Sequence, residues 1–235
     1  YSLSLVGFWA LAFFYSLNGI HHLIGGPVPT WLITVSVTAS VMMVIPVAAT
    51  AVNFHTTMQG RFRALRHSPT LAFVVAGAMI YTAASLQGSA EALRTVNRVT
   101  HFTHFTVAHA HLGVYGFASM VLFGAYYFIV PRLVNREWPR PALIRWHFWL
   151  ALGGIALYFV SLTIGGWIEG AWLLDAARPF GDVVNATKPY LLARSVGGTL
   201  MLAAHLVFAY HYWLMVRSRG TAQGEPARAE GSGAR

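Results

Sequence analysis

Six long apolar segments constrain this chain more than any other feature of its sequence. Each is long enough, at about 20 residues or more, to cross a bilayer as an α-helix. Hydrophobic residues make up 56% of the sequence and charged residues only 10%, whereas soluble domains are about one-quarter charged. The sequence therefore predicts an all-α integral membrane fold with six transmembrane helices, at residues 1–23, 31–58, 69–88, 104–131, 143–168 and 188–216.

The two ends of the sequence bound this membrane domain. Residues 218–235 are polar and rich in Gly, Ala and Arg, a composition that is typical of disordered segments. We therefore expect a membrane domain over residues 1–217, followed by a disordered cytoplasmic tail. The sequence starts at Tyr1 with no charged stretch before the first apolar segment, so we expect no cleavable signal peptide and expect the later part of a longer chain.

Basic residues are concentrated in alternate loops and in the tail. The net charge is +9, which in a membrane protein indicates cytoplasmic loops rather than nucleic-acid binding. The loops after the second and fourth segments and the tail contain Arg61, Arg63, Arg66, Arg132, Arg136, Arg140, Arg145, Arg217, Arg219 and Arg228. Basic residues on the opposite side are offset by Glu91, Glu169, Asp175 and Asp182. The positive-inside rule therefore places the Arg-rich loops and the C-terminus in the cytoplasm.

Two histidines in the fourth segment, His109 and His111 of "VAHAHLGVYG", are candidate ligands. Ionisable residues at membrane depth are costly and usually functional. Two residues apart on a helix means about 200° of rotation, so the two imidazoles cannot chelate one metal ion. Each can instead bind a different cofactor, and imidazole is a common axial ligand of haem iron. The alternative is that both only form hydrogen bonds to neighbouring helices.

Adjacent histidines, His21 and His22, end the first segment. On a regular helix their side chains point about 100° apart, but Asn18 and Gly19 are expected to loosen the helix end so that the imidazoles converge. With no cysteine in the chain, two or three imidazoles without thiolate form a reasonable copper site. Tyr15 lies about 9 Å earlier along the helix axis, and its phenol is a candidate donor of a proton and an electron. The alternative for Tyr15 is an interfacial aromatic side chain.

Taken together, these motifs resemble the catalytic subunit of cbb3-type (C-family) haem-copper cytochrome c oxidases. The resemblance is carried by "YSLNGIHHLIGGPVPTW", "VNRVTHFTHFTVAHAHLGVYGF", "GGWIEG" and "RSVGGTL", and it covers essentially residues 1–217. It implies that the six segments are the second half of a twelve-helix subunit I bundle. It also implies that a third copper histidine and the second axial ligand of the low-spin haem belong to earlier helices that this sequence does not contain.

The resemblance implies a role for each motif residue. His109 is expected to bind the iron of a high-spin haem b, and His111 the iron of a low-spin haem b. His21 and His22 are expected to be two of three ligands of the copper ion CuB. Tyr15 is expected to be the catalytic tyrosine, which in the family is cross-linked to the third copper histidine.

The implied activity is that of a proton-translocating terminal oxidase, which reduces dioxygen to water with electrons from cytochrome c. Haem-c-bearing subunits and cytochrome c are the expected partners. The expected location is the bacterial inner membrane, with the metal-site end towards the periplasm. One departure concerns a glutamate that family members carry near the catalytic haem: this sequence has Gln87 there, and Glu91 one turn on is a candidate substitute.

Two further sets of polar residues surround these motifs. Haem propionates need donors near the outer end of the domain, and the candidates there are Asn97, His101, His104 and Arg194, each with a solvated loop position as its alternative. A candidate proton path comprises Ser4, Tyr81 and Thr82, although Ser and Thr also pack between membrane helices. The remaining histidines are expected to be interfacial or packing residues: His55, His67, His147, His205 and His211.

Three alternative functions stay open at this point. A nitric oxide reductase of the same superfamily shares the histidine layout but has non-haem iron in place of copper; Tyr15 and the lack of a carboxylate near His21 favour the oxidase. A non-catalytic membrane fragment or assembly subunit would keep the helices without complete metal sites. A histidine-lined transporter gives no reason for two imidazoles on opposite faces of one helix.

Overall fold

The computed structural model describes residues 1–217, and all regular secondary structure in this part of the chain is helical. Six stretches within it are long and apolar enough to cross a membrane: Ser2–Leu23, Thr30–Met58, Pro69–Ala92, His104–Val134, Ala142–Leu173 and Phe180–Arg217. The expected all-α fold with six membrane spans is confirmed. The predicted disordered tail lies outside the described residues.

The first two spans are each divided into two helical parts. Helix α1 (Ser2–Asn18) continues into the 3-10 turn η1 (Gly19–Leu23), and α2 (Thr30–Met42) is followed directly by α3 (Val44–Met58). Pro46 has no N–H to donate to the carbonyl of Met42, which explains why the regular helix stops between α2 and α3.

The third and fourth spans follow two short helices. Turn η2 (Phe62–Arg66) precedes α4 (Pro69–Ala92), and α5 (Arg94–Thr100) precedes the fourth span. The fourth span consists of α6 (His104–His111), the π-helix η3 (Leu112–Ser119) and α7 (Met120–Val134). π-helices are rare overall, but those that occur are often found at functional sites. This one begins directly after His111.

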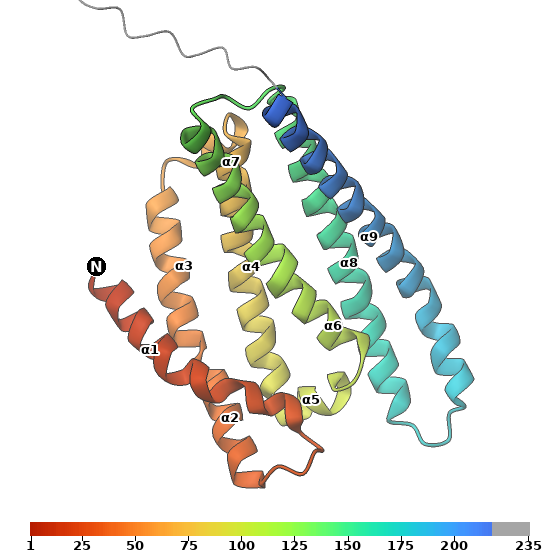
Figure 1. Cartoon of the computed structure of the whole chain (residues 1–235). Helices are drawn as coiled ribbons and strands as arrows, with labels where there is room; N and C mark the ends of the chain where they lie inside the picture. Colours follow the sequence, from red (N-terminus) through yellow and green to blue (C-terminus); the bar gives the residue numbers. More distant parts are fainter. Residues whose placement is uncertain (218–235) are drawn as a thin grey trace, which may run out of the picture.

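The last two spans, α8 (Ala142–Leu173) and α9 (Phe180–Arg217), pack side by side along their length (Figure 1). Glycines permit this approach, because a Cβ added to Gly154 would lie 2.9 Å from the carbonyl oxygen of Gly197. The last helix is longer than the predicted span 188–216, since α9 begins at Phe180. Its first turns contain Asp182 and Lys188, which lower the local hydropathy although they lie on a continuous helix.

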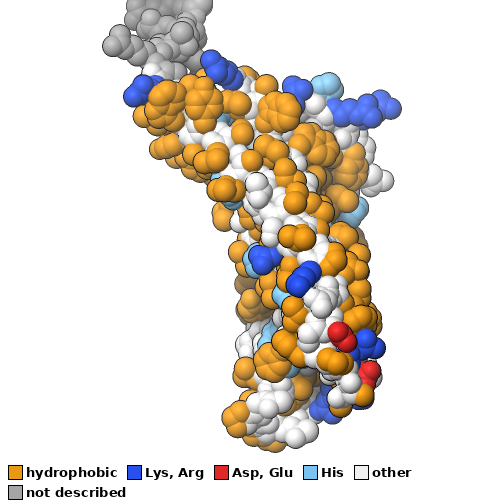
Figure 2. Space-filling model, turned by 90° about the vertical axis from the view of Figure 1, so that its right-hand side faces the viewer, with side chains coloured by type: hydrophobic (Ala, Val, Ile, Leu, Met, Phe, Trp, Pro, Cys, Tyr) orange, Lys and Arg blue, Asp and Glu red, His pale blue; other side chains and the backbone are white. Residues whose placement is uncertain are grey.

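The exposed surface is mostly apolar, as expected for a multi-pass membrane protein. Figure 2 shows hydrophobic side chains covering most of one face, with several basic side chains at the upper end and, near the lower end, acidic side chains accompanied by basic ones. Large apolar side chains on α1 are among the most exposed, such as Phe13 at 65% and Trp9 at 64%. A band of exposed apolar side chains of this kind is suited to lipid or to further membrane helices.

Candidate metal and cofactor site

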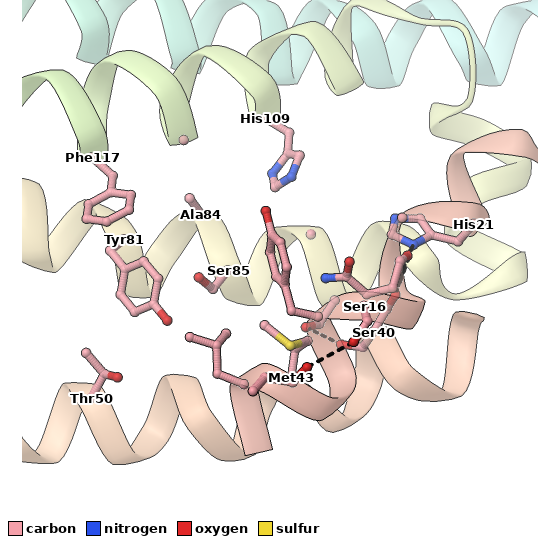
Figure 3. A pocket seen from close by; sticks show the side chains of 18 of the residues that line it. Ser16, His21, Ser40, Met43, Thr50, Tyr81, Ala84, Ser85, His109 and Phe117 are labelled. Carbon is pink, nitrogen blue, oxygen red and sulfur yellow. Dashed lines mark hydrogen bonds between the residues drawn. The ribbon is translucent and has the colours of Figure 1, made fainter. Parts of the chain in front are cut away.

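A cavity of about 1000 Å³ lies between α1, η1, α2, α3, α4, α6 and η3. Its lining includes Tyr15, His21, His22 and His109, so helix packing brings the first span and the fourth span to one place. Figure 3 shows His109 projecting into the cavity from α6, while His21 and Tyr81 come from other walls. Tyr15 is 66% exposed, so the cavity is open on the side of α1.

The imidazoles of His21 and His22 lie next to each other, with ring centroids 4.1 Å apart and an angle of 39° between the planes. The Nδ1 atom of His21 contacts the carbonyl oxygen of Asn18 and lies 2.9 Å from Ser40 Oγ. The backbone N–H of His21 donates to Ser36 Oγ at 2.9 Å. A carbonyl oxygen only accepts, so Nδ1 carries the hydrogen and the lone pair is on Nε2. That Nε2 atom is buried and has no hydrogen-bond partner, as a metal-binding nitrogen requires.

The imidazole of His109 occupies space that only a glycine leaves free. A Cβ added to Gly88 would lie 2.8 Å from His109 Cε1. His109 Nδ1 is buried without a hydrogen bond and lies 3.9 Å from Glu91 Oε2, which also has no hydrogen-bond partner. The other carboxylate oxygen of Glu91 accepts a hydrogen bond from Thr106 Oγ1 at 3.2 Å. Ligand histidines are usually oriented by a carboxylate at the second ring nitrogen, and Glu91, rather than Gln87, is in that position.

His111 does not line the cavity, and its side chain meets different neighbours. Its Nδ1 donates to the carbonyl oxygen of Val107 at 2.9 Å, and its Nε2 lies 3.3 Å from the hydroxyl oxygen of Tyr158 on α8. The side chains of His109 and His111 therefore lie in two separate environments, as their spacing on the helix predicts.

These donor groups fit the cofactors of the resemblance to different extents. The partly buried imidazole of His109 lines a large cavity and has the Glu91 carboxylate near its buried Nδ1, and it fits an axial ligand of haem iron. The orphaned Nε2 of His21 beside His22 fits part of a copper site. Among residues 1–217, no group of three or more His, Cys, Asp or Glu side chains is placed to hold a metal ion. A copper ion held by His21 and His22 would therefore need a further ligand from outside the described residues.

Two of the candidates for propionate binding have hydrogen-bond partners within the protein. Asn97 is buried, and its amide donates to the backbone carbonyl of Glu91 at 3.2 Å. His104 Nδ1 lies 2.6 Å from Glu169 Oε2, which also accepts the backbone N–H of His104 at 2.8 Å. These contacts join α5 and α6 to α4 and α8. Nothing in the local sequence pattern indicated Glu169, because its partner is 65 positions away.

His101 and Arg194 keep polar atoms that the described protein does not satisfy. His101 Nε2 and Arg194 Nε are both buried without a hydrogen-bond partner. Neither residue lines the large cavity. A buried, unpartnered guanidinium nitrogen is suited to an anionic group such as a carboxylate.

The three residues of the predicted proton path do not come together. Only Tyr81 lines the cavity. Ser4 accepts a hydrogen bond from Asn53 at 2.8 Å, and Thr82 donates to a carbonyl of its own helix at 3.3 Å. Five further Ser and Thr side chains that the sequence did not assign to the path also line the cavity, namely Ser16, Ser40, Thr50, Ser85 and Ser89. Of the remaining histidines, His147 and His211 are buried, in agreement with the packing role expected for them.

The described residues form a bundle of candidate membrane helices with imidazoles in two separate surroundings, and comparison with known sequences identifies the family. Residues 1–200 match the family described as "Cytochrome C and Quinol oxidase polypeptide I". The chain belongs to this family, which comprises subunit I of haem-copper oxidases.

Individual relatives agree with this assignment. The chain is 36% identical over 223 residues to cytochrome c oxidase subunit 1 of Rhodobacter capsulatus. This alignment covers 92% of this chain and 42% of that protein. It is 33% identical over 234 residues to the cbb3-type cytochrome c oxidase subunit CcoN1 of Stutzerimonas stutzeri, covering 97% of this chain and 49% of the relative. The chain therefore spans less than half the length of these relatives.

More distant matches extend across the superfamily. A nitric oxide reductase subunit of Stutzerimonas stutzeri is 26% identical over 148 residues, covering 60% of this chain and 30% of that protein. A heme-copper terminal oxidase dimer solved by cryo-EM has a TM-score of 0.67 at 18% identity, covering 86% of this chain and 39% of that chain. This structural likeness shows that the fold is shared.

Proposed function

We propose that this chain forms the C-terminal half of the catalytic subunit of a cbb3-type cytochrome c oxidase. The complete enzyme would reduce dioxygen to water with electrons from cytochrome c and couple this to proton uptake and translocation. One observation carries the proposal: Tyr15, His21, His22 and His109 line one cavity, while His111 faces a separate environment.

Each side chain has a distinct part in this proposal. His109 would hold a high-spin haem b and His111 a low-spin haem b, and His21 and His22 would hold CuB. When present, these metals would bind dioxygen and provide most of the electrons for its reduction. The phenol of Tyr15 would donate its proton to the reacting oxygen.

Groups behind the cavity wall and in its lining would position ligands and supply protons. Glu91 would orient His109 through Nδ1, since its carboxylate lies 3.9 Å away. The hydroxyl groups of Tyr81, Ser85 and Thr50, all in the cavity lining, would form with water the last part of the proton supply. We assign haem-c-bearing subunits and cytochrome c as partners, and the bacterial inner membrane, with a cytoplasmic C-terminus, as the location.

The second candidate is a nitric oxide reductase, in which non-haem iron replaces copper. Iron at such sites is typically held by histidines together with a carboxylate. The cavity lining contains no Asp or Glu among the described residues, and Tyr15 is present. These two observations favour copper and the oxidase.

Metal analysis of the complex that contains this chain tests the proposal. We expect one copper ion per complex, two b-type haems in the reduced-minus-oxidised spectrum and oxygen consumption that depends on cytochrome c. His21→Ala should remove the copper and keep both haems, whereas His55→Ala, on the exposed side of α3, should change neither. Non-haem iron without copper would reverse the choice in favour of the reductase, and a spectrum without b-haem bands would indicate a non-catalytic fragment.

A further inference from the structure

The turn that carries the two histidines of the first span is held from outside by α2. Turn η1 follows α1 without a break and packs against α2. In an α-helix the backbone N–H of His21 would donate to the carbonyl of Leu17. In this chain it donates to Ser36 Oγ at 2.9 Å, and Ser36 Oγ donates in turn to the carbonyl of Asn18 at 2.9 Å. The Ser36 hydroxyl thus bridges two backbone groups at the point where the α-helix becomes a 3-10 turn.

The backbone of Gly19 does not explain this change of helix type. Its φ of −70° and ψ of −20° lie in the right-handed helical region, which any residue adopts. A side chain that inserts into the hydrogen-bond ladder is one of the known causes of a local break in a helix. The Ser36 hydroxyl is such an insertion, and it comes from a segment that is remote in the sequence.

Ser40, one turn after Ser36 on α2, contacts the ring of the same histidine. Its Oγ lies 2.9 Å from Nδ1 of His21 and 3.0 Å from the carbonyl oxygen of Asn18. Both serines are buried. Helix α4 fixes α2 in turn, because Ser89 Oγ donates to the carbonyl of Ser40 at 2.8 Å. The histidine is therefore held at its backbone nitrogen and at one ring nitrogen by a helix that is itself fastened.

These contacts leave the second ring nitrogen of His21 available. Its Nε2 is buried and has no hydrogen-bond partner among the described residues, and His21 lines the cavity. The serine contacts reach Nδ1 and the backbone, so they do not compete with a metal ion for Nε2. A nitrogen that is already held in one direction loses little conformational freedom when it binds a metal ion.

We propose that Ser36 and Ser40 are positioning residues for His21: they fix the backbone and the ring so that Nε2 faces the metal site. Without the Ser36 hydroxyl, the N–H of His21 would be free to rejoin the hydrogen-bond ladder of α1, and the imidazole would turn away from its present direction. This inference rests on the proposed function, which assigns His21 to copper.

Copper retention in the purified complex tests this role. In Ser36→Ala we expect the chelator concentration that removes half of the copper to fall about tenfold, the lower end of the range for lost orienting contacts at metal ligands. Both b-type haems should stay at the parent's content, because their histidines come from another span. Thr38→Ala is the matched control, since it removes a hydroxyl of the same helix that donates to the carbonyl of Thr34. It should retain copper as the parent does.

Carbon monoxide bound to the reduced copper ion gives a second readout. The width of its infrared stretching band reports how uniform the geometry of the copper ligands is. We expect a narrow band in the parent and in Thr38→Ala, and a broader band in Ser36→Ala. A serine that only stabilised the fold would not change the band of the copper that remains.

The outcomes separate this inference from the proposed function. Parent-like copper retention in Ser36→Ala would overturn the inference and leave the oxidase assignment intact. Loss of copper and haem together would also overturn it, because Ser36 would then support the whole fold rather than one ligand. If the alanine variant does not assemble, Ser40→Ala, which removes the contact at Nδ1, makes the same prediction. A parent complex without a metal ion bound by His21 would contradict the proposed function itself.

Discussion

At the scale of single residues, small side chains determine where the imidazoles of the cavity can lie. Gly88 on α4 leaves the space that His109 occupies, and Ser36 and Ser40 on α2 hold the backbone and ring of His21. Neither kind of residue would bind a metal itself. Both position a nitrogen that would, and catalytic geometry is sensitive to displacements of about 1 Å.

We expect Gly88→Ala to lower turnover of the complex about 100-fold, because the added Cβ would lie 2.8 Å from His109 Cε1 and displace the ring. Oxygen consumption and the carbon monoxide difference spectrum of the high-spin haem would report the change. Gly153→Ala is the matched control, since a Cβ there meets no atom within 4 Å. Parent-like turnover in Gly88→Ala would show that His109 does not depend on this space.

At the scale of elements, the start of α6 is fastened to α8. The Glu169 carboxylate accepts hydrogen bonds from the ring Nδ1 and from the backbone N–H of His104. At the same helix start, Thr103 Oγ1 accepts a hydrogen bond from the backbone N–H of Phe105 at 3.2 Å. A Cβ on Gly166 would overlap the backbone of Phe105, so α6 begins in direct contact with α8. This attachment determines the height and rotation at which His109 and His111 enter the bundle.

Removing that attachment should destabilise the protein. We expect Glu169→Ala to cost about 1–3 kcal/mol, because the partly buried ring and backbone N–H groups of His104 lose their acceptor. The measurement is the free energy of unfolding of the purified complex in denaturant. Lys188→Ala, which removes an exposed contact to Asn185 within one helix, should stay within about 0.5 kcal/mol. Equal stability of the two variants would argue against Glu169 as an anchor.

At the scale of the whole molecule, one end of the bundle is strongly basic, whereas the other end has both acidic and basic side chains (Figure 2). The Arg-rich ends of α3, α4, α7 and α8 lie together, whereas the loop between α8 and α9 contains Asp175. Exposed apolar side chains cover most of the surface between the two ends. Such an arrangement favours a single orientation in the membrane, with the basic end inside.

Cysteine labelling tests this orientation, and the absence of native cysteine makes single substitutions clean. We expect Ala176→Cys, in the loop between α8 and α9, to react with a membrane-impermeant maleimide added to spheroplasts. Ala64→Cys, in η2, should react only after the membrane is permeabilised. Both positions are exposed in the structure. The reverse pattern would contradict the predicted topology.

Much of the architecture could be predicted from the sequence because it depends on local properties. Apolar length determined the six spans, and the rotation per residue determined that His109 and His111 leave opposite sides of one helix. Only the tertiary structure decided that His109 shares a cavity with His21 and that Glu91, rather than Gln87, faces the His109 ring. It also decided that Tyr158 lies against His111. These contacts join segments far apart in the chain. They depend on how closely and in what register the helices pack, and hydropathy and periodicity do not encode either quantity.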